Sequence, residues 1–329
     1  MFPAVYAGHL VDVAARFGVE ADELLEPFDF TLDELRDGTT RLEVKQVVEL
    51  VERARALTGE PALGVYLGLA MRASWHGYLG FAVLTARDLG DALKLGERFF
   101  PTRTDALSYR VSLTGCANET AVVTVLEHVD FGPARDVIVL ALLIGLSTLG
   151  HALTGRELDG RIEVALPRPD WLDRLAHPRL ARLGFDRAAH RLVFDAELLR
   201  TPFQLADAAA KRLAAEQCEK ELAALSVSSR VSSRVRALVL GDGGVLDVEA
   251  VAKALAMSVR TLKRRLASEG TSYSDLLDQE RRARAEQLLA TERSVKEIAA
   301  ALGFADTAAF SHAFTRWTGR SPSQWRADR

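Results

Sequence analysis

VEAVAKALAMSVRTLKRRL (residues 248–266) and VKEIAAALGFADTAAFSHAF (residues 295–314) repeat one pattern of apolar residues near the end of a chain of 329 residues. The matched apolar positions are Val248, Val251, Ala252 and Leu255 in the first stretch, and Val295, Ile298, Ala299 and Leu302 in the second. Spacings of three and four residues place these side chains on one face of a helix. A second helix follows a tight turn at Ala256 or Gly303, so each stretch predicts a helix-turn-helix unit.

The second helix of each predicted unit begins after an N-cap residue, Ser258 or Asp306. In the first unit Leu262 and Leu266 supply the inner face of this helix, and basic side chains cover its outer face. These basic residues are Arg260, Lys263, Arg264 and Arg265. Because arginine can bind O6 and N7 of guanine with two hydrogen bonds, we expect this helix to enter the major groove of DNA. A solvated basic face on an ordinary helical hairpin would have the same pattern.

The distribution of charge along the chain supports the DNA interpretation. The formal net charge is −3, yet residues 228–329 contain 17 Lys and Arg against 12 Asp and Glu, which leaves the remainder acidic. Basic side chains attract phosphate whatever the base sequence. A helix predicted over residues 273–289 joins the two units and is about 25 Å long at 1.5 Å per residue. We expect it to set the two recognition helices in successive turns of the major groove, about 34 Å apart.

Residues 228–326 resemble the AraC/XylS family of bacterial transcription activators. The most specific part of the resemblance is the run Gly303-Phe304, Phe310, Phe314, Trp317, Gly319, Ser321-Pro322 and Trp325-Arg326. By position, the resemblance implies that bases are read by Arg260, Lys263 and Arg264 in the first unit and by Thr307, Ala308, Ser311 and His312 in the second. Contacts to phosphate are expected from Ser258, Thr261, Arg265, Arg316 and Arg320. The implied partners are double-stranded promoter DNA and RNA polymerase.

One position departs from the family pattern. The family commonly has Arg where this chain has His312. A charge-assisted contact to a base is therefore lost, or depends on protonation of the imidazole. We expect the second unit to read its bases less exactingly than the first.

Residues 1–225 predict an α+β domain, and residues 226–329 predict an all-α domain with two helix-turn-helix units joined by a spacer helix. The first domain shows a helical pattern over residues 44–57 and strands over residues 107–114, 120–127, 161–166 and 191–194. The Ser-rich segment of residues 226–235 marks the boundary. An Ala-rich helix before it, over residues 202–225, is expected to place Leu205, Ala209 and Leu213 along one face. It either covers the core of its own domain or pairs two subunits.

Two stretches of the first domain, YLGFAVLTARDLGDALKLGERFF (residues 78–100) and HPRLARLGFDRAAHRLVF (residues 177–194), resemble the ligand-sensing domain of one AraC-type subgroup. This subgroup is distinct from the sugar-binding cupin of the arabinose regulator. The resemblance implies binding of a small-molecule effector and formation of a homodimer. Apolar and polar side chains that lie close together make Trp75, His76, Tyr78 and Phe81 candidates for an effector pocket. As core residues they would look the same, and the domain could instead only dimerise or bind a protein partner.

The sequence contains none of the motifs HExxH, GxSxG or GxxxxGK[ST], so we expect no enzymatic activity and no metal or cofactor. Cys116 and Cys218 stand apart and are expected to be buried thiols. The N-terminal residues lack the pattern of a signal peptide, which predicts a cytoplasmic protein. The apolar run at residues 137–150 is shorter than the roughly 20 residues needed to cross a bilayer and predicts a core helix.

Overall fold

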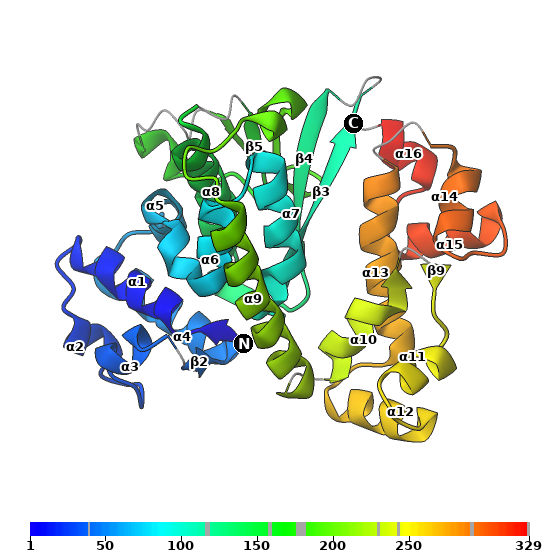
Figure 1. Cartoon of the computed structure of the whole chain (residues 1–329), viewed down its shortest axis with the longest axis horizontal. Helices are drawn as coiled ribbons and strands as arrows, with labels where there is room; N and C mark the ends of the chain where they lie inside the picture. Colours follow the sequence, from blue (N-terminus) through cyan, green and yellow to red (C-terminus); the bar gives the residue numbers. More distant parts are fainter. Residues whose placement is uncertain are drawn as a thin grey trace. The chain divides into compact units, whose positions relative to one another are not determined.

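The computed structural model describes residues 1–38, 40–115, 119–156, 160–175, 182–228, 231–241, 244–289 and 293–327. They form two compact units, and the second begins at Ala223, after Leu222 (Figure 1). The predicted domain boundary, after Leu225, lies three residues further along the same helix (Ala208–Ser228). The turn residue Cys116 lies outside the described residues.

The first unit is built on a five-stranded sheet with the strand order β3-β4-β7-β5-β6. The strands are β3 (Leu107–Thr114), β4 (Thr120–Glu127), β5 (Arg161–Glu163), β6 (Leu183–Gly184) and β7 (His190–Asp195). Strand β7 is antiparallel to β4 and to β5, and β5 is parallel to β6. All four predicted strands are present, although β5 ends at Glu163. A cupin has a pair of packed antiparallel sheets, whereas the main sheet of this unit is mixed and combined with helices, as the subgroup resemblance implied.

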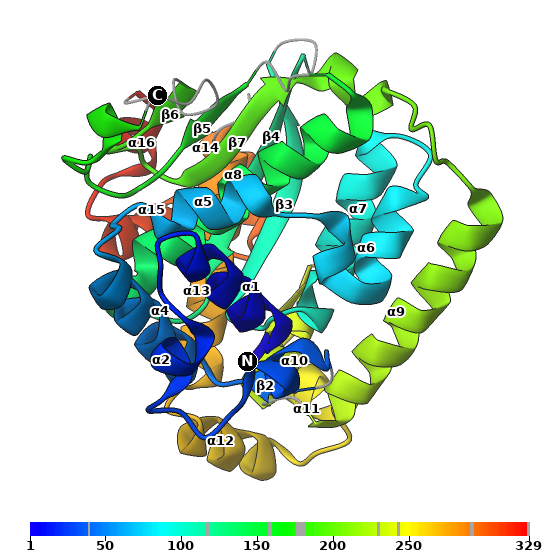
Figure 2. The same ribbon diagram turned by 90° about the vertical axis from the view of Figure 1, so that its left-hand side faces the viewer.

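Helices cover this sheet and extend away from it (Figure 2). They are α1 (Val5–Ala15), α2 (Ala21–Leu25), α3 (Leu32–Arg36), α4 (Val44–Thr58), α5 (Leu63–Ala70), α6 (Gly77–Leu84), α7 (Leu89–Phe99), α8 (Arg135–Thr154) and α9 (Ala208–Ser228). The short strands β1 (Phe2–Pro3) and β2 (Arg41–Leu42) pair with each other. Helices α1 to α4 enclose a core of their own around Leu24, Leu35 and Leu50, which are all buried.

Helix α8 contains the apolar run of the sequence and packs closely against α5. A side chain at Gly64 would lie 2.5 Å from the carbonyl oxygen of Val137, and one at Gly68 would lie 2.7 Å from Cβ of Ile144. By length and composition α8 could cross a membrane, but Val137 and Ile144 are buried within the unit together with Leu140 and Leu143. It is the core helix that the sequence predicted.

Helix α9 begins at Ala208, six residues later than predicted, and Asp207 caps it: its carboxylate accepts hydrogen bonds from the backbone N–H groups of residues 209 and 210. Leu205 precedes the helix and is 66% exposed, and Leu213 is 59% exposed, so the predicted apolar face does not cover the core of this unit. The buried face is formed by Ala214 and Cys218, which are four residues apart, and Cys218 packs against Phe99. Pairing of two subunits through the exposed face stays a prediction. Cys218 is a buried free thiol, as predicted.

The second unit is helical, apart from the strand pair β8 (Leu240–Gly241) and β9 (Gly244–Val245). Its helices are α10 (Val231–Val239), α11 (Val248–Ala254), α12 (Val259–Ser268), α13 (Tyr273–Leu288), α14 (Val295–Ala301), α15 (Thr307–Thr318) and α16 (Pro322–Ala327). Two small cores lie along α13. Leu276 of α13 packs in the first, with Leu262, and Ala285 packs in the second, with Phe310 and Phe314. The predicted pair of helix-turn-helix units with a spacer helix is present.

Candidate DNA interface and effector pocket

The turns of the two helix-turn-helix units have the same backbone geometry. Ala256 has φ +54° and Gly303 has φ +69°, both in the left-handed region. In each turn the following amide donates to the carbonyl four positions before the turn residue, from Met257 to Ala252 and from Phe304 to Ala299, at 2.9 Å. These bonds cap the first helix and redirect the chain into the second. The duplication seen in the sequence is therefore a duplication of backbone structure.

Helix α12 presents a cationic surface. Its N-cap Ser258 accepts a hydrogen bond from the backbone N–H of Thr261 at 3.2 Å. Leu262 and Leu266 are fully buried, so the helix is fixed to its unit by one face. The other face exposes Arg260, Lys263, Arg264 and Arg265. Within the described part of the chain none of these four side chains forms an ion pair, so their charges are available to a partner.

Helix α15 has a less charged outer face. Its N-cap Asp306 accepts from the backbone N–H of Ala309 at 2.7 Å. Ala308 and His312 are exposed, whereas Thr307 and Ser311 are half-buried. The Ser311 hydroxyl donates to the carbonyl oxygen of Thr307 at 2.8 Å, so only its acceptor positions remain open.

The two basic residues at the end of α15 are in different situations. Arg316 donates from Nη2 to Asp278 Oδ2 on α13 at 2.7 Å. Its charge is therefore partly neutralised by the spacer helix. Arg320 follows the helix and is exposed.

Arg281 of α13 holds the turn of the second unit in place. Its guanidinium donates to the carbonyl oxygens of Leu302 at 2.9 Å and of Gly303 at 3.1 Å. It also lies over the ring of Phe304, 4.5 Å from the centroid. This role of Arg281 was not predicted, because an arginine within a charged helix has the pattern of a surface residue and its partners lie about twenty residues away.

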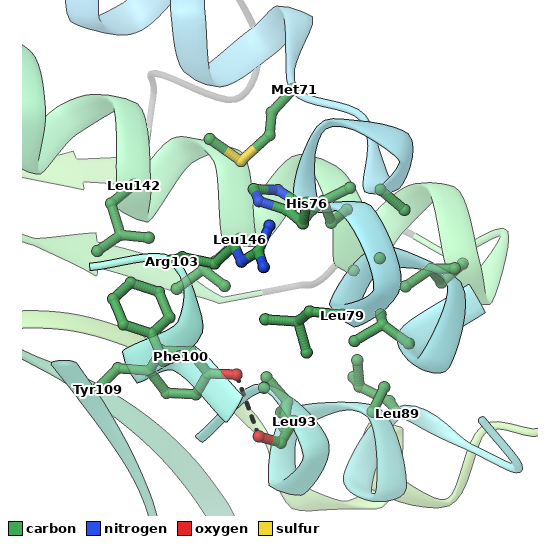
Figure 3. A pocket seen from close by; sticks show the side chains of 18 residues that line it. Met71, His76, Leu79, Leu89, Leu93, Phe100, Arg103, Tyr109, Leu142 and Leu146 are labelled. Atoms are coloured by element: carbon green, nitrogen blue, oxygen red, sulfur yellow. Dashed lines mark hydrogen bonds between the residues drawn. The ribbon is translucent and has the colours of Figure 1, made fainter. Parts of the chain in front are cut away.

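A cavity of about 80 Å³ lies within the first unit, between α6, α7 and α8 (Figure 3). Its lining is almost wholly apolar and includes Leu79, Leu93, Phe100, Leu142 and Leu146. The polar side chains in the lining are His76, Arg103 and Tyr109, and the Tyr109 hydroxyl donates to the carbonyl oxygen of Leu93 at 3.1 Å.

Of the four predicted pocket residues, the structure places His76 in this lining and the other three outside it. Leu79 and Val83 line the cavity, so Tyr78 and Phe81 of α6 point the other way and are 48% and 57% exposed. Trp75 stacks on the ring of His9, with 3.6 Å between the centroids. Arg103 was not predicted, because no local pattern distinguishes it from surface arginines.

The two nitrogens of His76 have different surroundings. Nδ1 lies 2.8 Å from the hydroxyl of Tyr6, and Nε2 is buried without a hydrogen-bond partner among the described residues. Burial, assisted by the positive charge of Arg103, lowers the pKa of His76 to about 4. The imidazole is therefore neutral at physiological pH. Burial raises the pKa of the Tyr6 hydroxyl, so this contact joins two neutral groups.

Residues 18–203 match the family model described as the arabinose-binding N-terminal domain of the AraC transcription regulator, and residues 251–328 match a model of a helix-turn-helix domain. The ornithine utilization regulator of Pseudomonas aeruginosa is 34% identical, over 99% of this chain and 96% of the relative. The regulator VirS of Mycobacterium tuberculosis is 28% identical, over 96% of this chain and 93% of the relative. Among solved structures, the regulator CdpR of Pseudomonas aeruginosa is 25% identical and has a TM-score of 0.41, over 88% of this chain and 99% of that chain.

Proposed function

The chain belongs to the AraC family of transcription regulators, and from this premise we propose that it activates transcription by binding promoter DNA with both helix-turn-helix units. The observation that carries the proposal is the exposed face of α12, where four basic side chains have no ion-pair partner among the described residues. In the first helix-turn-helix unit, bases are read by Arg260, Lys263 and Arg264. In the second helix-turn-helix unit, bases are read by Thr307, Ala308, Ser311 and His312.

Contacts to phosphate come from residues at the edges of the two recognition helices. We assign Ser258, Thr261 and Arg265 to this role in the first unit, and Arg320 in the second. Arg316 joins them only if its guanidinium leaves Asp278, which lies 2.7 Å away. Each contact made by an arginine adds to the salt dependence of binding, because its charge releases counterions from the DNA.

An experiment on the full chain tests this proposal. Sequences bound by the protein are selected from a random pool of double-stranded DNA, and the affinity for the selected sequence is measured between about 50 and 200 mM salt. We expect the affinity to fall about tenfold or more over this range, because Arg265 and Arg320 each neutralise one phosphate. Failure to select any sequence, or an affinity that does not change with salt, would reject the proposal.

We further propose that a small-molecule effector binds in the cavity between α6, α7 and α8 and controls the regulator. An apolar space with a few polar groups in its lining is typical of ligand sites. A bound effector stabilises the folded unit by mass action, so it raises the melting temperature of the protein. A thermal-shift screen against a broad set of metabolites tests this, and a screen without any shift would contradict it.

A second candidate function for the first unit is pairing with another protein, either a second copy of the chain or RNA polymerase. The observation that favours it is the exposure of Tyr78 and Phe81 on α6, since aromatic side chains are enriched at protein interfaces. Sedimentation of the wild type and of Phe81→Ser tests whether the chain forms a homodimer through α6, because such a homodimer dissociates in the variant. Either function places the protein in the cytoplasm, where promoter DNA is found in bacteria.

A further inference from the structure

The polar end of the cavity has nitrogen atoms without a hydrogen-bond partner. His76 lines the cavity, and its Nε2 is buried without a partner among the described residues. Arg103 donates from Nε to the Thr102 hydroxyl at 3.0 Å and from Nη2 to the carboxylate of Glu221 on α9. Its Nη1 forms no hydrogen bond within the described residues and approaches Gly77, where a side chain would come within 3.2 Å of it. A ligand that fills this end must therefore bring an acceptor.

The charges around this end of the cavity leave an excess of positive charge. Arg103, Arg41 and the N-terminal ammonium of Met1 are positive, whereas Glu221 and Asp105 are negative. The Met1 ammonium pairs with Asp105 at 2.6 Å, and Arg103 pairs with Glu221. Arg41 donates to the carbonyl oxygen of Thr102 and forms no ion pair within the described residues. One additional negative charge would balance the cluster.

The remainder of the cavity is apolar and small. A group the size of a water molecule needs about 10–15 Å³ of such space, so a cavity of about 80 Å³ holds roughly five to eight non-hydrogen atoms. An ammonium group buried among Leu142, Leu146 and Leu79 would have no acceptor and would be strongly disfavoured. Zwitterionic amino acids are therefore poor ligands.

On the basis of the proposed effector pocket, we propose that the effector is a short aliphatic monocarboxylate whose carboxylate is bound by Arg103 and His76 and whose tail lies among the leucines of the cavity. The carboxylate accepts from Nη1 of Arg103 and from Nε2 of His76, in the tautomer that carries its proton there. Glu221 accepts from Nη2 of the same guanidinium, so both carboxylates can be bound at once, but they compete for its positive charge.

Calorimetric titration of the full chain with hexanoate and with hexanamide, at pH 7.5, tests the chemical class of the ligand. The two probes have the same shape, and only hexanoate is charged. We expect hexanoate to bind at least tenfold more tightly, because hydrogen bonds to a charged acceptor are about twice as strong as those to a neutral one. Butyrate should bind about tenfold more weakly than hexanoate, because two methylenes fewer are buried.

Variants connect the binding to the named residues. Arg103→Met combined with Glu221→Gln removes both charges together, so that no buried carboxylate is left unpaired, and should weaken hexanoate binding at least tenfold. Glu221→Gln alone removes the competing carboxylate and should strengthen binding about fivefold. The matched control is Arg98→Met, which removes an ion pair between α7 and α9, that with Glu219, and should leave binding unchanged.

The outcomes separate this inference from the proposed function. Equal binding of hexanoate and hexanamide would overturn the carboxylate assignment and leave effector control intact. Binding of ornithine in the same cavity would overturn the exclusion of zwitterionic ligands and likewise leave effector control intact. The absence of a thermal shift with any metabolite would overturn both. Unchanged hexanoate binding in the double variant would show that the acid binds elsewhere.

Discussion

Ala256 and Gly303 adopt the same left-handed conformation at equivalent turns of the two helix-turn-helix units, with φ +54° and φ +69°. Glycine reaches this region without strain, whereas a residue with a Cβ atom does so at a cost of about 1 to 2 kcal/mol. In the first helix-turn-helix unit the geometry of the motif therefore holds Ala256 in a strained conformation. This strain lowers the stability of that helix-turn-helix unit.

Replacing Ala256 by glycine should stabilise the second compact unit, which contains both helix-turn-helix units. We expect a gain of about 0.5 to 1 kcal/mol, because relief of strain exceeds the added entropy of the unfolded chain. Calorimetry should show the transition of this unit raised by a few degrees. Gly303→Ala is the reciprocal variant and should lower it, because the new side chain would also come within 2.9 Å of Val245. A lower transition temperature for Ala256→Gly would mean that the left-handed turn is not strained.

Removal of Arg281 should destabilise the second helix-turn-helix unit. Arg281→Ala deletes two hydrogen bonds to backbone carbonyls and the contact with the Phe304 ring, and we expect a loss of about 2 to 3 kcal/mol. Hydrogen exchange of the α14 and α15 amides measures this loss of stability. The neighbouring Arg282→Ala loses only an exposed pair with Glu286 on the same helix and should cost less than about 0.5 kcal/mol. Similar exchange in both variants would contradict a role of Arg281 in fixing the turn.

The stability of the first unit should fall as the pH is lowered from about 6.5 to 4. Burial lowers the pKa of His76 to about 4 in the folded protein, below the value of about 6.5 in the unfolded chain. The unfolded chain therefore takes up a proton that the folded unit does not, and stability present above pH 6.5 is lost as the pH falls toward 4. The full difference is about 2 to 3 kcal/mol.

Urea unfolding of the wild type and of His76→Phe at pH 7 and pH 4.5 measures this dependence. The variant should lose less stability between the two pH values than the wild type does. His151→Asn, at the end of α8, is the control and should behave as the wild type. An equal loss in His76→Phe would show that His76 is not the group responsible.

The two recognition helices should respond differently to substitution. Arg264→Ala should weaken DNA binding by about 1 to 3 kcal/mol and relax base preference at one position, as expected for loss of a bidentate contact to guanine. His312→Ala should cost less, and His312→Arg should strengthen binding by adding a charged donor to α15. Arg265→Ala should weaken binding to all sequences alike, since phosphate carries no sequence information. Fluorescence titrations against the selected DNA give these values, and equal losses for Arg264→Ala and His312→Ala would contradict the asymmetry.

The sequence predicts the helix-turn-helix units well because their fold follows from local spacing. Val251 and Leu262 lie within a few residues of the turn that brings them together, and both are buried as expected. Helix α9 shows the limit of such patterns. Its Ala-rich sequence allows several faces to be the inner one, and contact with Phe99, far away in the chain, selects Cys218.

The cavity could not be predicted for a similar reason. His76 ends the 3-10 helix η1 (Ala73–His76), and Arg103 follows the 3-10 helix η2 (Phe100–Thr102). The two residues meet only because these segments fold around the same space, and neither belongs to a motif. Tyr78 and Phe81 were predicted to line a pocket because they lie close to Trp75 and His76 in the sequence, yet the register of α6 turns them to solvent. A strand of two residues such as β6 is also too short to show an alternating pattern.

The central claim, that one chain reads two successive segments of the major groove, is tested most directly by selecting bound DNA sequences with the wild type and with Arg264→Ala. The wild type should select two conserved elements whose centres lie about 10 to 10.5 base pairs apart, one for each recognition helix. Arg264→Ala should lose preference within one element and keep the other unchanged. A single selected element, or loss of preference in both elements at once, would contradict the account.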